Sequence, residues 1–197
     1  MNASDALDRL AEIHDHLTRA EVYRGFRVPA VFAVGVIGLV AAAVQSSVVP
    51  AEGVGFVWYW VGVAGGCGGI GVVTALRSYL LHEDEDARRQ ARKVLAQFFP
   101  CVVVGAAVTV AVVRHGPELI SLLPGVWAAV FGLGVIAARP YVPAGVGTIG
   151  VWYLLVGVAL VLGVAVLPSA WAVGGVFGLG HLATAWVLWR EQGDDDE

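Results

Sequence analysis

The chain has 197 residues, of which 58% are hydrophobic and only 14% are charged, whereas a soluble domain carries about 25% charged residues. This composition excludes a soluble globule, which needs a polar shell, and it excludes a disordered chain, which needs a low apolar content. The net charge of −4 offers no basic field to nucleic acid. The composition therefore predicts an integral membrane protein.

Charge-free stretches long enough to cross a bilayer, about 20 residues each, recur along the chain. The 50 residues from 140 to 189 contain no Asp, Glu, Lys or Arg, and Pro168 divides them because proline does not continue a helix. Membrane barrels alternate apolar and polar residues, which these runs do not. We predict an all-α transmembrane bundle within residues 28–190, with six spans at about 28–49, 54–76, 94–113, 119–138, 145–167 and 170–189.

Charged segments lie between and beside these spans. Residues 1–27 hold an amphipathic pattern over 3–21, which predicts a cytoplasmic helix. Its mixed charges fit docking on the bundle, or pairing with a second copy, better than a membrane surface. Residues 82–97 are acidic first and basic last, which predicts a cytoplasmic helix that runs into the third span. It is either a partner- or lipid-binding handle or a solvated stop-transfer helix. Residues 191–197 form an acidic tail.

The basic residues predict an orientation. Of the 12 Lys and Arg residues, all but Arg114 fall on one side of the predicted membrane. Such residues are in excess on the cytoplasmic side, so both termini are expected in the cytoplasm. At the outer end of the second span, Trp58, Tyr59 and Trp60 are interpreted as anchors in the headgroup region.

The predicted spans contain few ionisable or reactive side chains. They hold no Asp, Glu, Lys or Arg, which disfavours proton-coupled or charge-selective transport. No nucleophile–base set, paired carboxylates or metal-ligand spacing is present, so we expect no enzyme, metal site or cofactor. His181 in the sixth span is the exception. Its expected partner is a hydroxyl such as Thr109 or Thr148, or a backbone carbonyl, and Thr184 is a further polar candidate. Its role is either a structural hydrogen bond or ligand or pH sensing.

Glycine accounts for 26 residues, and small residues let membrane helices approach closely. Two stripes are predicted to pack against other helices. One stripe lies in the second span and consists of Gly62, Gly66 and Gly69. The other lies in the sixth span and consists of Gly174 and Gly178. Because glycines face nearly every side of the second span, this helix is expected at the centre of the bundle. Packing within one chain is favoured over dimerisation.

A weak internal repeat supports a second hypothesis for the function. Residues 57–64 resemble 151–159, and residues 28–33 resemble 123–128. Two inverted halves of three helices are typical of transporters, although chance similarity in a narrow amino-acid alphabet competes with a true repeat. The leading hypothesis is a non-enzymatic protein that acts by packing or by binding a protein partner, including a second copy. The alternative is a small transporter or channel for a neutral or apolar solute.

Several short motifs resemble a family of small bacterial membrane proteins with six spans. The segments that carry the resemblance are Leu10-Ala-Glu-Ile-His14, Leu123-Pro-Gly-Val-Trp127, Phe131-Gly-Leu-Gly134 and Gly175-Val-Phe-Gly178-Leu-Gly-His181. The family's Phe-Gly-x-x-His element falls on Phe177, Gly178 and His181, whereas its frequent tyrosine in the fourth span is replaced by Phe131. The resemblance implies a six-helix fold and draws attention to His181. It implies no reaction.

Overall fold

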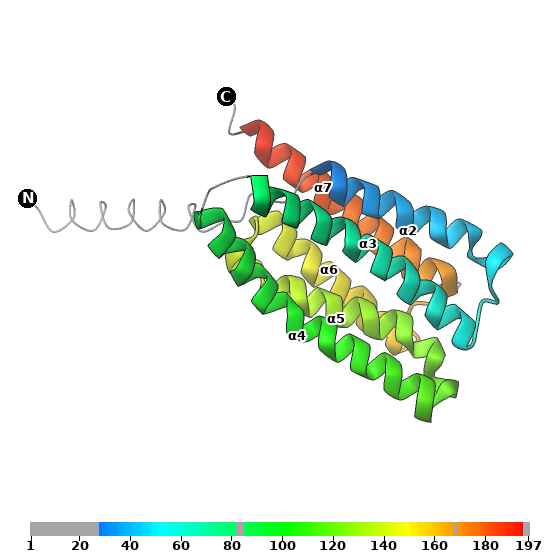
Figure 1. Ribbon diagram of the computed structural model, residues 1–197. Coiled ribbons are helices and arrows are strands. Elements are labelled where there is room, and N and C mark those ends of the chain that lie inside the picture. Colours follow the sequence, from blue (N-terminus) through cyan, green and yellow to red (C-terminus); the bar gives the residue numbers. More distant parts are fainter. Residues whose placement is uncertain (1–27, 82–84, 168, 195–197) are drawn as a thin grey trace, which may run out of the picture.

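The computed structural model describes residues 28–81, 85–167 and 169–194, and within them it contains long helices and no strand (Figure 1). Six helical segments are long and apolar enough to cross a membrane, by length and composition. The predicted all-α bundle with six apolar helices is confirmed, and a multi-pass membrane protein is supported. The amphipathic pattern over residues 3–21 and the last three residues of the acidic tail lie outside the described residues.

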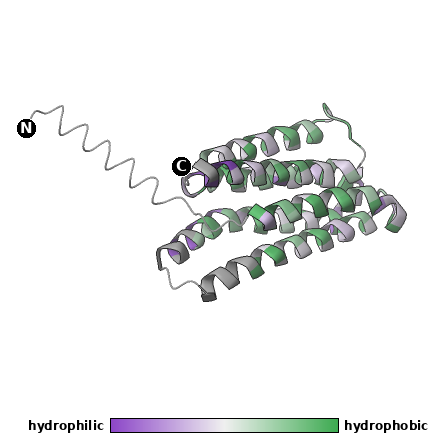
Figure 2. Ribbon diagram, turned by 90° about the horizontal axis from the view of Figure 1, so that it is seen from above, coloured by the Kyte–Doolittle hydropathy of each residue, from purple (hydrophilic) through white to green (hydrophobic). Residues whose placement is uncertain are grey.

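The helices follow one another up and down the bundle. Their bounds are α2 (Val28–Val48), α3 (Val54–Leu81), α4 (Glu85–His115), α5 (Leu123–Ala137), α6 (Ala144–Val161) and α7 (Val176–Asp194). Three short helical segments accompany them: η1 (Pro117–Leu122) and η2 (Arg139–Tyr141), which are 3-10 helices, and η3 (Trp171–Gly175), which is a π-helix. Two names are used for the ends of the bundle. The turn end is the one at residues 49–53, between α2 and α3, and the terminal end is the one at residues 138–143, where α7 ends. Hydrophobic residues run along the helices between these ends (Figure 2).

Helix α6 ends earlier than predicted. The predicted fifth span ended near residue 167, but α6 ends at Val161. Gly163 has a φ of +68°, a left-handed conformation that commonly ends helices, and the N–H of Val164 donates back to the carbonyl of Ala159 at 3.0 Å. Residue 168, the predicted break, is not described. Residues 85–97 form the first part of α4 and continue into the third span without interruption.

Two helix pairs pack backbone against backbone through glycine. In the α2–α7 pair, a Cβ placed on Gly35 would lie 3.0 Å from the carbonyl oxygen of Gly178, and one on Gly178 equally close to that of Gly35. In the α5–α6 pair, a Cβ on Gly125 would lie 2.8 Å from the carbonyl oxygen of Gly157. Lipid is as apolar as leucine, so membrane helices associate mainly through such close packing. These pairs therefore form the frame of the bundle.

Helix α3 lies at the periphery, so the prediction that it occupies the centre is wrong. Phe56, Val57 and Trp60 of its first turns are buried, whereas its glycines are not. A Cβ at Gly62, Gly66 or any other glycine of this helix would meet nothing within 4 Å. The predicted stripe of Gly62, Gly66 and Gly69 thus has no packing partner among the described residues. Its i, i+4, i+7 spacing places it on the face turned away from Phe56 and Trp60.

The turn end of α3 is held to α2 by hydrogen bonds. The Trp60 Nε1–H donates to Oε1 of Gln45 at 3.0 Å, and the Tyr59 hydroxyl donates to the carbonyl of Ala41 at 2.7 Å. Gln45 is fully buried. Trp60 is also buried, so the interpretation of this residue as a headgroup anchor is wrong. Tyr59 is half-buried and stays a predicted anchor that also hydrogen-bonds to α2. Trp58 is 59% exposed and remains in an anchor position.

Candidate functional site

His181 lies in a three-membered polar cluster that joins α6 to α7. Its Nδ1 is 2.8 Å from the carbonyl oxygen of Phe177, one turn earlier in α7, and 3.1 Å from the hydroxyl of Tyr153 in α6. The Tyr153 hydroxyl is itself 3.0 Å from the same carbonyl oxygen. Tyr153 is almost completely buried. Gly180 makes room for it, since a Cβ there would overlap the tyrosine ring.

The geometry defines where the protons lie. A carbonyl oxygen only accepts hydrogen bonds, so the short contact to Phe177 requires a proton on Nδ1 of His181. The Tyr153 hydroxyl then donates to the same oxygen, which has two lone pairs. Nε2 of His181 has no hydrogen-bond partner within the part of the chain that the structure describes. The cluster therefore works as an interhelical link in which Tyr153 and His181 share one acceptor.

Aromatic rings surround this link. Phe131 of α5 is their hub, with ring centroids 4.9 Å from Tyr153, 5.2 Å from Phe177 and 5.6 Å from His181. Phe98 of α4 packs edge-on against Phe131 at 5.2 Å. The family resemblance favoured a tyrosine at the position of Phe131, and here an apolar ring brings four helices together. Aromatic pairs of this geometry add about 0.5–1.5 kcal/mol each beyond the burial of their area.

The predicted polar residues do not form one site. Thr109 in α4 accepts the Nε1–H of Trp127 in α5 at 2.8 Å and donates to the carbonyl of Gly105 at 2.7 Å. Thr184 donates to the carbonyl of Gly180 within its own helix at 2.8 Å. Neither threonine hydrogen-bonds to His181. Each polar side chain is thus paired separately, and the structure assembles no set of groups that resembles a catalytic centre among these residues.

The glycine stripe of the sixth span is divided between two neighbours. Gly174 and Gly178 face α2, where a Cβ on Gly178 would lie 2.7 Å from the Leu39 side chain. His181, three residues after Gly178 in α7, contacts α5 and α6 instead. The stripe therefore helps to hold α7 between the two halves of the bundle.

Sequence reasoning missed Tyr153 and Gln45. Tyr153 is in the middle of α6, far from the span ends where tyrosine serves as an anchor. Gln45 interrupts an apolar span and shares one face with Gly35, Gly38 and Ala42, all of which are buried. A polar residue in line with small residues is the signal that would have found it, because both features belong to helix contacts in membranes.

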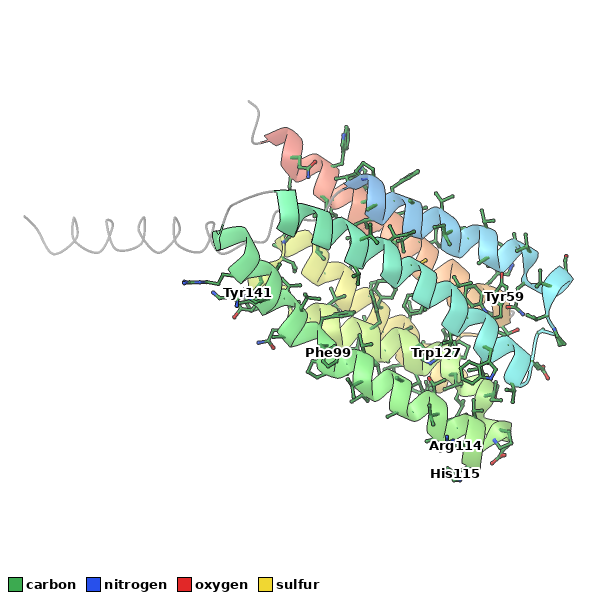
Figure 3. All side chains as sticks on the ribbon, in the orientation of Figure 1. Tyr59, Phe99, Arg114, His115, Trp127 and Tyr141 are labelled. Carbon is green, nitrogen blue, oxygen red and sulfur yellow. The ribbon has the colours of Figure 1, made fainter. Side chains whose placement is uncertain are left out.

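A groove opens between α3 and α4 at the turn end. Its volume is about 220 Å³, and its walls are Trp58, Val61, Ala106, Thr109, Val110, Val113 and Arg114. Figure 3 shows Arg114 beside His115 at this end of α4, with Trp127 also toward the turn end and Tyr141 at the opposite end. Arg114 is exposed and has no ion pair or hydrogen bond within the described ranges.

Comparisons with protein-family models, with curated proteins and with solved structures give no match. The internal repeat receives no support from the packing, because α5 and α6 meet backbone to backbone at Gly125 and Gly157, whereas α2 and α3 meet through Tyr59, Trp60 and Gln45.

Proposed function

We propose that this chain is a non-enzymatic multi-pass protein of a bacterial inner membrane, and that it acts by helix association through α3. The observation that carries the proposal is the open space around the glycines of α3. Gly62, Gly65, Gly66 and Gly69 have the i, i+3, i+4, i+7 spacing of one helix face. All four are exposed, so this glycine face is presented to whatever surrounds the bundle.

The other helices supply an internal control. A Cβ added to a glycine of the other helices would meet another atom within 4 Å. This holds for every glycine of α2, α4, α5, α6 and η3, and for those of α7 up to Gly180. Most of these glycines therefore lie in close contact with another segment; the exceptions are Gly105, whose added Cβ would be 3.9 Å from its nearest atom, and Gly175, whose nearest atoms belong to Trp171 of its own segment. Glycine costs about 1 kcal/mol relative to alanine in an aqueous helix, and close approach is the gain that offsets this cost. The glycine face of α3 fits a partner helix from outside the described chain.

The partner that fits this face most simply is α3 of a second copy. A twofold axis places the same surface of each copy against the other, so the surface must be self-complementary. A face of small residues meets this requirement, because two such faces bring their backbones together without interlocking side chains. Docking of a different protein on residues 3–21 or on the start of α4 adds to this arrangement and does not replace it.

The mass of the protein in mild detergent tests the proposal. Light scattering after size-exclusion chromatography is expected to give a dimer for the wild type and a monomer for Gly66→Leu, because the added side chain separates the two glycine faces. Ala107→Leu is the matched control, since Ala107 is a small, exposed residue of α4. This variant is expected to remain dimeric. A monomeric wild type, or a dimer that tolerates Gly66→Leu, contradicts the proposal.

The orientation is part of the same proposal. Arg139 and Arg190 lie at the terminal end and Arg114 lies at the turn end, so the excess of basic residues supports a cytoplasmic terminal end. A tag fused after residue 197 is expected to resist labelling from outside intact cells. Labelling of the tag would contradict this orientation.

A further inference from the structure

We infer that the groove between α3 and α4 is a binding site for an anionic phospholipid, with the headgroup phosphate on Arg114 and one acyl chain between the helices. On α3 the groove adjoins the glycine face, because Trp58 lies one turn before Gly62. The inference rests on the groove and on Arg114 of α4, and it does not depend on association through the glycine face. Its walls are apolar apart from Thr109 and Arg114. These two residues decide what kind of molecule the groove accepts.

Thr109 has no free hydrogen-bond donor for a ligand. Its hydroxyl proton goes to the carbonyl of Gly105, and its oxygen accepts the Nε1–H of Trp127. The body of the groove is therefore a mainly apolar surface whose threonine has no free donor. A neutral polar solute would lose most of its hydration there for few hydrogen bonds, whereas a hydrocarbon chain loses nothing.

Arg114 gives the groove one charged end. Its guanidinium has no carboxylate partner within the described ranges, and guanidinium groups bind phosphate through paired hydrogen bonds. From Ala106 to Arg114 the groove follows nine residues of α4, and the eight steps between them span roughly 12 Å of helix at 1.5 Å per residue. This length places the charge at the headgroup level and the apolar walls beside the upper part of an acyl chain.

The size of the groove also favours a lipid. A volume of about 220 Å³ is below the roughly 300–1,000 Å³ of pockets that enclose a small ligand. The groove therefore holds part of a molecule whose remainder lies in the bilayer. Trp58 of α3, with 59% of its surface exposed, stands opposite α4 at the rim, where an indole ring suits the headgroup boundary.

Retention of added lipid by the detergent-purified protein, measured by native mass spectrometry, tests the inference. The probes are phosphatidylglycerol and phosphatidylcholine with the same acyl chains. The wild type is expected to retain phosphatidylglycerol in preference, and Arg114→Gln is expected to bind it about fivefold more weakly, the effect of one basic residue near an anionic headgroup. Arg190→Gln is the charge control, because Arg190 is also an exposed arginine at a span end, where it packs on Trp186.

A second pair of variants tests the acyl part of the site. Ala106→Phe fills the groove and is expected to reduce phosphatidylglycerol retention, whereas Ala107→Phe adds the same ring at the neighbouring exposed position and is expected to leave it unchanged. Equal retention of the two lipids by the wild type would overturn the inference. So would equal losses for Arg114→Gln and Arg190→Gln, or for the two phenylalanine variants.

Discussion

Buried polar side chains determine how neighbouring helices meet in this bundle. Tyr153, His181 and the Phe177 carbonyl form one link between α6 and α7, and Gln45 with Trp60 forms another between α2 and α3. Unpaired polar groups are costly in hydrocarbon, so each link fixes the rotation of its helices. In the first link the Phe177 carbonyl still accepts one hydrogen bond when either donor is removed. The loss of one donor therefore costs less stability than the loss of the whole link.

The hydroxyl of Tyr153 supplies a test at this scale. Tyr153→Phe removes one donor and leaves the Nδ1–H of His181 on the carbonyl. We expect the free energy of unfolding, measured in bicelles, to fall by about 0.5–1 kcal/mol, a typical value for such bonds in membranes. Tyr141→Phe is the control, because the Tyr141 hydroxyl makes no hydrogen bond within the described ranges. A fall above about 3 kcal/mol, or none at all, would disagree with the shared-acceptor geometry.

At the scale of helices, glycine has two different roles. In α5 and α6 it lets backbones touch, and in α3 it lines a face without a neighbour among the described residues. These roles predict opposite responses to an added methyl group. An internal contact loses its fit, whereas an open position gains the greater helix propensity of alanine.

Gly157→Ala and Gly68→Ala form a matched pair for this difference. A Cβ on Gly157 would lie 2.6 Å from the carbonyl oxygen of Gly125, so α6 must move, at an expected cost of about 1–3 kcal/mol. A Cβ on Gly68 would meet nothing within 4 Å, and we expect that variant to be neutral or slightly stabilised. The free energy of unfolding in monomer-forming detergent measures both. Equal effects in the two variants would mean that the two glycines have similar surroundings.

The sequence predicts where the helices lie along the chain better than it predicts which helices pack against one another. The number and approximate bounds of the apolar helices follow from charge-free runs, because the bilayer imposes a length on every crossing. Which glycine packs where does not follow from sequence, since Gly62 and Gly174 have the same local pattern and only the fold gives one of them a neighbour. Tyr153 was missed for the same reason. Its partner, His181, lies 28 residues further along the chain and in another helix.

The whole molecule is unevenly packed. In an 18-residue apolar stretch of α7 and its preceding turn, 50% of the residues are buried, against 17% in the corresponding stretch of α3 and 6% in that of α4. The α2–α7 and α5–α6 pairs form the frame, while α3 and α4 cover one side of it and leave a groove between them at the turn end (Figure 1). The surfaces available for a second copy and for lipid therefore lie mainly on these two helices.

Cross-linking in native membranes tests most directly whether α3 joins two copies. Cys67 and Cys101 are first replaced by alanine, and a single cysteine is introduced by Val73→Cys, beside the glycine face, or by Leu133→Cys, at an exposed position of α5. With a short bismaleimide we expect a cross-linked dimer from Val73→Cys, little from Leu133→Cys, and loss of the dimer when Gly66→Leu is added to Val73→Cys. Equal yields from the two cysteine positions, or a yield that Gly66→Leu leaves unchanged, would contradict association through the glycine face of α3.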